Sequence, residues 1–279
     1  MSVTVREALA TGAMWLKDAG VEGAEKDVRI LLAKAMEVEP THLLLIEDEE
    51  VHPDVFRTYD NFLAAREKFQ PVSQIIGGRE FWGRWFKVTR DVLDPRPDTE
   101  SLIEKTLEGG ARQRVLDMGT GSGILAVTLA AEWPEARVIA TDISTPALEI
   151  AAENALEHGV AERIQFAESD WFEQVGGTFD LIVCNPPYIS LEEMGSLSPD
   201  VRNWEPFLAL TPGGDGLEAY RIIAAGLENY LDEGGLALFE IGYRQGDAVS
   251  EIFRAAGFGA VTVSKDLSGH DRIVAVARE

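Results

Sequence analysis

The chain has 279 residues, of which 46% are hydrophobic and 26% are charged. This is enough apolar material for one large or two modest globular domains, and it excludes a disordered or fibrous chain. Lys and Arg number 25 against 48 Asp and Glu, which gives a formal net charge of −23. Because so large an acidic excess repels phosphate backbones, a general nucleic-acid binder is disfavoured.

Cysteine content and hydropathy bear on the compartment. One cysteine, Cys184, and four scattered histidines exclude a disulfide framework and a Cys/His zinc cluster, and they favour a reducing environment. No apolar run approaches the roughly 18 residues that a membrane span needs. Glu7 and Asp18 lie where a signal peptide would need a basic start followed by an apolar stretch. We therefore expect a cytoplasmic protein with no membrane segment and no metal, and by default a monomer.

Residues 1–74 have the pattern of a small helical bundle. Thr4 and Glu7 have the spacing of a capping box that opens a first helix. Apolar residues recur at helical period through this helix, through a second one that ends before Pro40, and through a third one after Pro53. This part holds 8 basic and 14 acidic residues and no constellation of catalytic type. We expect it to form a domain that recognises a partner or steadies the rest of the chain.

The pattern changes after residue 74. An aromatic, alternating stretch predicts a β-hairpin, which we expect to serve as a linker over residues 75–92. Residues 93–279 repeat a strand, a turn and a helix, which predicts an α/β domain with a doubly wound, mostly parallel sheet and a ligand at the carboxyl ends of its strands. The last two of its seven strands should pair antiparallel, joined by 266–271. The expected strands are Val115–Met118, Val138–Ala140, Ile164–Ala167, Phe179–Cys184, Leu236–Ile241, one around Val261, and Ile273–Val276.

A glycine-rich motif, Asp117–Gly123, directly follows the first strand of that sheet. Its alternating glycines let the backbone pass close beneath a ligand, and the helix start offers free N–H groups. The dinucleotide-binding fingerprint requires its third glycine at the position that Ile124 occupies, so NAD is disfavoured as the ligand. Asp142 ends the second strand and can accept hydrogen bonds from ribose hydroxyls. The glycine-rich turn and Asp142 together therefore indicate a nucleoside-containing cofactor. The structural alternatives are a tight turn and a helix N-cap, although Ser144 could cap that helix instead.

A second motif, Asn185-Pro186-Pro187-Tyr188, follows the strand that ends at Cys184. A side-chain amide offers an acceptor and a donor in one plane, so Asn185 can hold and orient a planar amide or amidine. The two prolines stiffen the loop, and Tyr188 can pack its ring against a flat substrate. The alternative is a rigid turn with a core tyrosine. The two motifs together are far more specific than either one alone.

These motifs resemble those of class I S-adenosylmethionine-dependent methyltransferases that alkylate a planar exocyclic or amide nitrogen. Further stretches closely resemble the HemK/PrmC family, the glutamine methyltransferases that modify the GGQ glutamine of class-1 peptide chain release factors: Glu80–Gly83, Pro95–Glu100, Asp170–Phe172, and Asp215–Leu217 with Tyr220 and Arg221. The likeness covers essentially the whole chain, because the helical first part also resembles the N-terminal domain of that family. Asp94, Met118 and Cys184 depart from the usual residues, and Asp94 leaves the local polarity open.

The resemblance implies a role for each motif residue. Asn185, Pro186, Pro187 and Tyr188 would hold the substrate glutamine at the catalytic centre, with Asn185 also beside the cofactor. No metal would be needed, S-adenosylhomocysteine would be the product, and a release factor would be the protein partner. The residues implied to contact the cofactor are Gly119, Thr120, Gly121, Ser122 and Gly123 under its methionine part, Asp142 at its ribose, and Trp171 against its adenine region.

Two side chains have plain structural alternatives. A lone tryptophan such as Trp171 is more often an ordinary core residue. Arg96 stands between two prolines, which is typical of a rigid surface corner with a solvated guanidinium, and we assign it no catalytic role.

An amide nitrogen is a weak nucleophile because its lone pair is delocalised. We therefore expect geometry to supply much of the catalysis, with the Asn185 carbonyl and a backbone carbonyl of the two prolines accepting the amide hydrogens.

Other functions stay open at this stage. An Asn-Pro-Pro-aromatic loop also suits an enzyme that methylates the amino group of adenine or guanine, but residues 75–279 hold 17 basic and 34 acidic residues. A ribosomal protein glutamine is another possible acceptor. A non-catalytic cofactor-binding scaffold would not need the Asn185 loop. An NAD dehydrogenase is opposed by the glycine spacing and by the lack of an obvious proton-donating histidine.

Overall fold

The computed structural model describes residues 3–266 and 268–279 and contains two compact units. The first comprises the described residues up to Gly78 together with Ser198–Trp204, and the second comprises Arg79–Leu197 and Glu205–Glu279. The sequence did not predict that Ser198–Trp204 belongs to the first unit. None of the helices in the described residues is both long and apolar enough to cross a membrane.

The first unit is a helical bundle, as predicted. Its capping box is confirmed, because the Thr4 hydroxyl accepts a hydrogen bond from the Glu7 amide at 3.3 Å and the Glu7 carboxylate accepts one from the Thr4 amide at 2.9 Å. Tyr59 is buried in a core formed mainly by its longer helices. The elements of this unit are β1 (Val3–Thr4), α1 (Val5–Asp18), α2 (Ala24–Met36), a 3₁₀ turn (His42–Leu45), β2 (Glu50–Val51), α3 (Pro53–Arg66), α4 (Val72–Ile76) and α8 (Pro199–Trp204).

The short helix α8 contacts this unit through hydrogen bonds of its last residue and through one ion pair. The indole N–H of Trp204 donates to the carbonyl of Lys68 at 2.9 Å, and the Gln74 side chain donates to the carbonyl of Trp204 at 3.1 Å. The buried Arg66 guanidinium lies 3.8 Å from the Asp200 carboxylate. A segment from the second half of the chain therefore packs as part of the helical unit.

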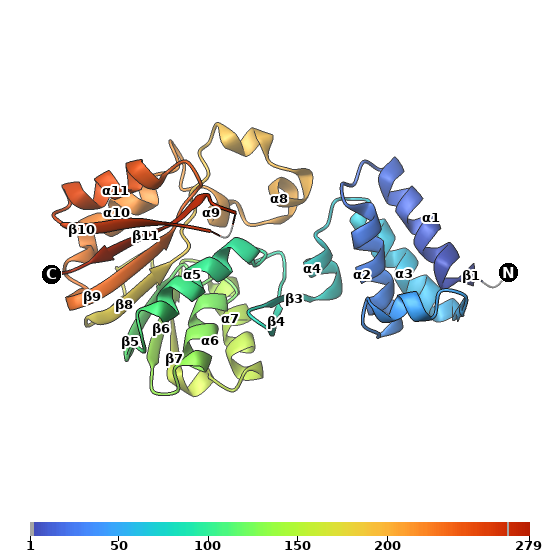
Figure 1. The fold of residues 1–279 in the computed structure, drawn as a ribbon, viewed down its shortest axis with the longest axis horizontal. Coiled ribbons are helices and arrows are strands. Elements are labelled where there is room, and N and C mark those ends of the chain that lie inside the picture. Colours follow the sequence, from blue (N-terminus) through green and yellow to red (C-terminus); the bar gives the residue numbers. More distant parts are fainter. Residues whose placement is uncertain (1–2, 267) are drawn as a thin grey trace. The chain divides into compact units, whose positions relative to one another are not determined.

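The second unit is built on one seven-stranded sheet of order β10-β11-β9-β8-β5-β6-β7, which confirms the predicted α/β fold (Figure 1). Strands β5 to β9 pair in parallel, and β11 runs antiparallel to both of its neighbours. The stretch between the last two strands includes residue 267, which lies outside the described residues. The strands are β5 (Arg114–Met118), β6 (Arg137–Asp142), β7 (Ile164–Glu168), β8 (Phe179–Cys184), β9 (Leu231–Glu240), β10 (Ala260–Lys265) and β11 (Asp271–Ala277).

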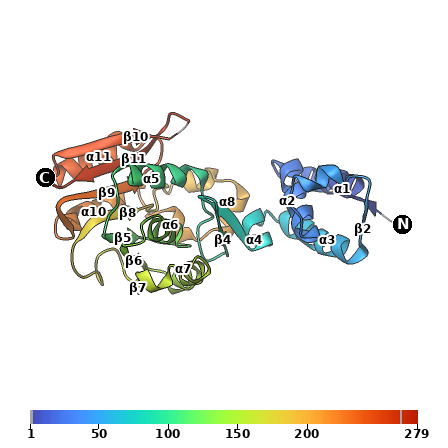
Figure 2. The same cartoon turned by 60° about the horizontal axis from the view of Figure 1, so that its bottom comes forward.

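Helices cover both faces of this sheet, with α5, α6 and α7 on one face and α10 and α11 on the other (Figure 2). Neighbouring residues of β5 therefore enter different cores: Val115 packs with α5 and α6, whereas Leu116 packs with α10 and α11. Apolar runs without alternation suit strands that are buried on both sides. The helices are α5 (Pro97–Glu108), α6 (Ile124–Glu132), α7 (Thr145–Glu157), α9 (Phe207–Leu210), α10 (Glu218–Leu227) and α11 (Gly246–Ala255), with 3₁₀ turns at Ala161–Arg163 and Glu193–Ser196.

The predicted β-hairpin is present as β3 (Gly78–Phe81) and β4 (Arg84–Lys87), which pair with each other. Phe81 and Phe86 are buried in the core beneath α5 and α6. The Glu100 carboxylate of α5 accepts a hydrogen bond from the amide of Trp82 in the turn at 2.9 Å. The hairpin is thus anchored in the second unit by packing as well as by hydrogen bonding.

Candidate active site

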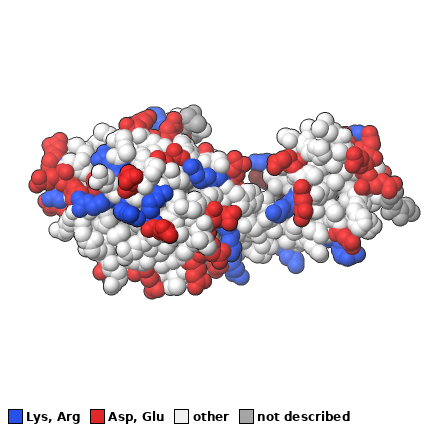
Figure 3. Space-filling view, turned by 90° about the horizontal axis from the view of Figure 1, so that it is seen from below, with Lys and Arg blue, Asp and Glu red and all other residues white. Residues whose placement is uncertain are grey.

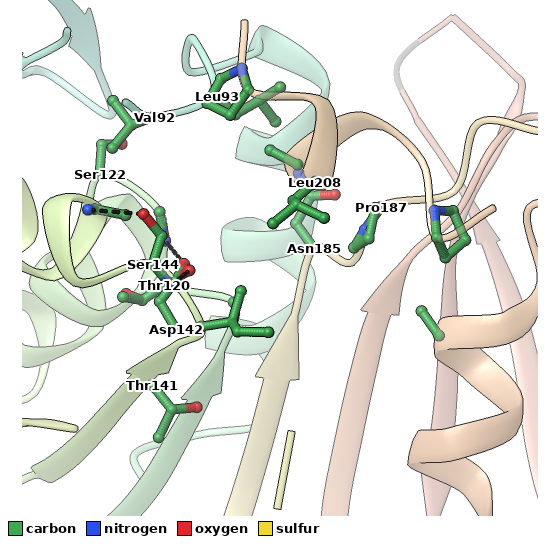
Figure 4. Close-up of a pocket in the computed structure, with 18 of the residues that line it drawn as sticks. Val92, Leu93, Thr120, Ser122, Thr141, Asp142, Ser144, Asn185, Pro187 and Leu208 are labelled. Atoms are coloured by element: carbon green, nitrogen blue, oxygen red, sulfur yellow. Dashed lines mark hydrogen bonds between the residues drawn. The ribbon is translucent and has the colours of Figure 1, made fainter. Parts of the chain in front are cut away.

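A cavity of about 660 Å³ opens at the carboxyl ends of the parallel strands in the second unit. The loops after four neighbouring strands line it: Gly119–Ser122 after β5, Asp142 at the end of β6, Ser169–Trp171 after β7 and Asn185 after β8 (Figure 4). The chain proceeds from β5 toward β7 on one side and continues with β8 and β9 on the other. This switch point is where doubly wound sheets bind their ligands, and the volume suits a small molecule.

The glycines of the first motif have two different functions in the fold. Gly119 and Gly121 have positive φ angles of 67° and 55°, and a Cβ at either position would meet nothing within 4 Å. Both line the cavity, so a ligand can approach their backbone closely. Gly123, at φ 83°, is not among the residues that line the cavity, and a Cβ there would stand 3.0 Å from the Cβ of Ala151 in α7. It therefore allows α6 to pack closely against α7.

Asp142 is held by the backbone of both neighbouring turns. Its Oδ2 accepts a hydrogen bond from the Gly121 amide and its Oδ1 accepts one from the Ser144 amide, each at 2.9 Å. Each oxygen retains a lone pair for a further donor. Burial raises the pKa of Asp142. Ser144 is the N-cap of α7, since its hydroxyl accepts from the Ala147 amide at 3.3 Å, so the reading of Asp142 as that cap is wrong.

Asp117 is fully buried behind the glycine turn. Its Oδ2 accepts hydrogen bonds from the Thr120 hydroxyl at 2.6 Å and from the Ala126 amide at 3.1 Å, whereas its Oδ1 has no partner among the described residues. Burial raises the pKa of Asp117 to about 7, against the opposing effect of the two hydrogen bonds. Sequence reasoning gave this residue no role, although a carboxylate inside an apolar strand was a usable signal.

Asp117 should make the protein less stable as pH rises. The pKa of an aspartate in an unfolded chain is roughly 3.9, whereas the pKa of Asp117 in the folded protein is about 7. Between these values the folded state holds the extra proton, so this residue lowers the free energy of unfolding by up to about 1.4 kcal/mol per pH unit as pH increases. Urea unfolding from pH 5 to 7 should show a decline that Asp117→Asn reduces. The exposed Glu168 provides the control Glu168→Gln, which should keep the wild-type slope. Equal slopes for all three proteins would contradict the prediction.

The residues of the second motif separate in the structure. Asn185 and Pro187 line the cavity, whereas Pro186 is buried. The Tyr188 ring packs against the core around α10, and burial raises the pKa of its phenol. Its backbone carbonyl accepts a hydrogen bond from the Gln245 side chain at 2.9 Å. Tyr188 therefore occupies a core position beside the cavity, and the stacking role suggested for it stays a prediction.

A glycine of a later motif explains how this loop is held. Gly216 has a φ of 80°, and a Cβ there would lie 2.4 Å from the carbonyl oxygen of Tyr188 and 3.0 Å from the amide nitrogen of Ser190. A residue with a side chain would push the loop away. The Asp215–Leu217 stretch thus acts as a backbone support for the segment that follows Asn185.

Trp171 both lines the cavity and packs partly against the core. It has a φ of 49°, which is unusual for a large side chain. Ser169 stabilises this turn, because its hydroxyl donates to the Trp171 carbonyl and accepts from the Gln174 amide, both at 3.0 Å. The structure brings Trp171 to the same cavity as the glycine turn and Asp142.

Arg96 is not the solvated surface corner that the sequence suggested. One of its terminal nitrogens donates to both carboxylate oxygens of Glu205, at 2.6 and 2.8 Å, and the Glu205 side chain is only 1% exposed. The buried Asp94 lies 3.9 Å from Arg96 and pairs with Arg79 at 2.9 Å. This cluster links the start of α5 to the segment whose next residues, Pro206 to Ala209, line the cavity. Sequence reasoning missed the Arg96–Glu205 pair because its members are 109 residues apart.

The fold, the glycine turn and the amide-bearing loop define a class I methyltransferase, a Rossmann-like enzyme that uses S-adenosylmethionine. The Methyltransferase small domain family matches residues 91–196, and the PrmC N-terminal domain family matches residues 7–77. A solved structure of the ribosomal protein L11 methylase from Lactobacillus delbrueckii subsp. bulgaricus is similar, with a TM-score of 0.50 and 26% identity over 67% of this chain and 83% of that chain.

Two curated relatives identify the family. The release factor glutamine methyltransferase of Cereibacter sphaeroides is 52% identical, over 96% of this chain and 96% of its own length. That of Caulobacter vibrioides is 39% identical, over 98% of this chain and 96% of its own length. The chain belongs to the release factor glutamine methyltransferase family. Within the described residues, no group of three or more His, Cys, Asp or Glu side chains could hold a metal ion.

Proposed function

We propose that the protein transfers a methyl group from S-adenosylmethionine to the side-chain amide nitrogen of the GGQ glutamine in a class-1 peptide chain release factor. Similarity to the release factor glutamine methyltransferases over nearly the whole chain supports this proposal. The structural observation that carries it is the presence of Asn185 and Asp142 in one cavity, at the ends of strands on either side of β5. The side of the cavity at Asp142 thus suits a ribose, and the side at Asn185 suits a planar amide.

The residues of the cavity fit S-adenosylmethionine. The open backbone at Gly119 and Gly121 admits a closely bound ligand, and Asp142 offers lone pairs to ribose hydroxyls. Trp171 offers a flat apolar surface, and the unpartnered Oδ1 of Asp117 is a buried acceptor behind the turn. When bound, the cofactor supplies an electrophilic methyl group on a sulfonium sulfur.

The chain acts on the acceptor through hydrogen bonds. The amide nitrogen of glutamine is a weak nucleophile, so its orientation matters more than its activation by a base. We assign the acceptance of its two hydrogens to the side-chain oxygen of Asn185 and to a backbone carbonyl of Pro186 or Pro187. Both acceptors interact more strongly as the nitrogen gains positive charge, which stabilises the transition state more than the ground state. The proton then passes to water.

The charge of the protein favours a basic partner. The formal net charge is −23, and on the face drawn in Figure 3 acidic side chains are spread over both units, while basic ones form a short row on the larger unit and smaller groups elsewhere on both units. A basic, RNA-binding protein is attracted to such a surface, whereas DNA or RNA itself is repelled. A cytoplasmic location and a monomeric state stay predictions.

Transfer of radiolabelled methyl groups tests the proposed substrate. Purified enzyme should label a wild-type class-1 release factor and should leave unlabelled a factor whose GGQ glutamine is replaced by alanine. Duplex DNA and a glutamine-bearing ribosomal protein serve as competing acceptors. Label on DNA or on the ribosomal protein alone, or on no acceptor, would overturn the substrate assignment.

A further inference from the structure

We infer that Thr99 and Glu240 are positioning residues that fix which end of the Asn185 amide faces the cavity. This inference rests on the proposed function, because it matters only if Asn185 orients a substrate amide. Thr99 lies in the first turn of α5, and Glu240 is the last residue of β9, the strand next to β8. Three separate elements therefore meet beside the cavity wall at Asn185.

The side chains of Asn185, Thr99 and Glu240 form a short chain of polar groups. The Asn185 side-chain nitrogen donates to the Thr99 hydroxyl oxygen at 3.3 Å. The Thr99 hydroxyl also interacts with the Glu240 carboxylate, whose Oε2 is buried and has no hydrogen-bond partner among the described residues. Thr99 and Glu240 are 0% and 1% exposed, so water does not compete for these groups. Glu240 therefore offers an unused buried acceptor for the proton of the Thr99 hydroxyl.

The direction of this chain decides the orientation of the amide. A threonine hydroxyl has one proton to donate, and a carboxylate can only accept. When Glu240 takes that proton, Thr99 offers only lone pairs to Asn185, which must then turn its NH₂ group toward Thr99. Its carbonyl oxygen faces the cavity as a result. The opposite orientation would place one NH₂ group against that of the substrate glutamine.

The charges around Glu240 support its role as an acceptor. Burial raises the pKa of Glu240 to about 7, but the Thr99 hydroxyl and the guanidinium groups of Arg272 in β11 and Arg96 before α5 favour the ionised carboxylate, and Asp98 opposes it. The Arg272 guanidinium also lies 3.0 Å from Asp98, which offsets that negative charge. The other titratable groups that face Glu240 are Tyr188, Tyr220 and Cys184, whose pKa values are raised by burial, so that they are neutral near pH 7.

The variant Thr99→Val tests this inference in the full-length enzyme with S-adenosylmethionine and a release factor. It keeps the side-chain shape and removes the hydroxyl, so we expect kcat to fall about 10- to 100-fold because the amide loses its fixed orientation. The KM for S-adenosylmethionine should change less than about twofold, since Asp142 and the glycine turn are untouched. Thr99→Ser restores a hydroxyl and should recover most of kcat. The control is Thr128→Val in α6, because the buried Thr128 hydroxyl has no partner among the described residues.

The outcomes separate the two proposals. If the wild-type enzyme methylates the release factor and Thr99→Val has an unchanged kcat, the positioning role is wrong and the function stands. If the wild-type enzyme labels no release factor, the proposed function fails and this inference fails with it. Glu240→Gln decides the matter if Thr99→Val does not fold, because its amide can donate to Thr99 and turn the hydroxyl proton toward Asn185. That variant should also lose kcat with its KM for the cofactor retained, and an unchanged kcat would overturn the inference.

Discussion

Replacement of Asn185 by alanine should lower kcat for glutamine methylation by about 10²- to 10³-fold, as expected when one preorganised partner of a developing charge is removed. Asn185 is half-buried at the cavity wall, and its NH₂ group is already bonded to Thr99. The remaining oxygen is the group that we assign to the substrate amide. Because Asp142 and the glycine turn do not depend on this side chain, the Kd for S-adenosylmethionine should change much less.

Single-turnover methyl transfer at saturating cofactor measures the first effect, and calorimetric titration with S-adenosylhomocysteine measures the second. The matched control is Asn203→Ala, which alters an exposed asparagine on α8 and should leave both quantities unchanged. If Asn185→Ala weakened cofactor binding without slowing transfer from the bound complex, Asn185 would belong to the cofactor site instead.

Asp142→Ala should have the complementary effect, a loss of cofactor affinity of about 10²-fold with a smaller change in kcat at saturating cofactor. Each hydrogen bond to a charged group contributes about 1.5–3 kcal/mol, and two ribose hydroxyls fit the two carboxylate oxygens. The substitution also removes the acceptor that holds the Gly121 amide at 2.9 Å, so the turn beneath the ligand loosens.

Titration with S-adenosylhomocysteine checks this expectation, with Glu168→Ala as the matched control. Glu168 ends the neighbouring strand β7, but its carboxylate accepts a hydrogen bond from the Thr145 hydroxyl at 2.6 Å outside the cavity wall. An Asp142 variant that retained wild-type affinity and lost turnover would show that the carboxylate acts on the acceptor and not on the ribose.

The fold was predictable where its signals are local. The capping box of Thr4 and Glu7 depends on residues three positions apart, and each strand with its following turn and helix depends on a continuous stretch of chain. The two cavity motifs were found for the same reason, because each follows directly after a buried strand. Parallel strands then bring their carboxyl ends to one edge of the sheet, so motifs 68 residues apart, at Asp117 and Asn185, meet without any further signal.

Features that depend on distant pairing were not predictable. Arg96 was read as a solvated corner because its partner Glu205 is 109 residues away, and the bond between Thr99 and Asn185 spans 86 residues. From the motif alone, Gly123 was expected to lie under the ligand like Gly119 and Gly121. In the structure its missing side chain allows α6 to pack closely against α7. The roles of the individual cavity residues in binding and catalysis stay predictions until the variants are measured.

The assignment of α8 to the helical unit has a consequence for how the chain can be divided. The chain passes between the two units after residues 78, 197 and 204, so a single cut near residue 78 does not yield two intact parts. An enzyme truncated before residue 79 would keep Trp204 but leave it without Lys68 and Gln74. Pro206 and Phe207 line the cavity two and three residues after Trp204, so the cavity-lining segment begins directly after the last residue of the helical unit. The helical unit is therefore joined to the second unit at three points of the chain, one of which directly precedes the cavity-lining segment.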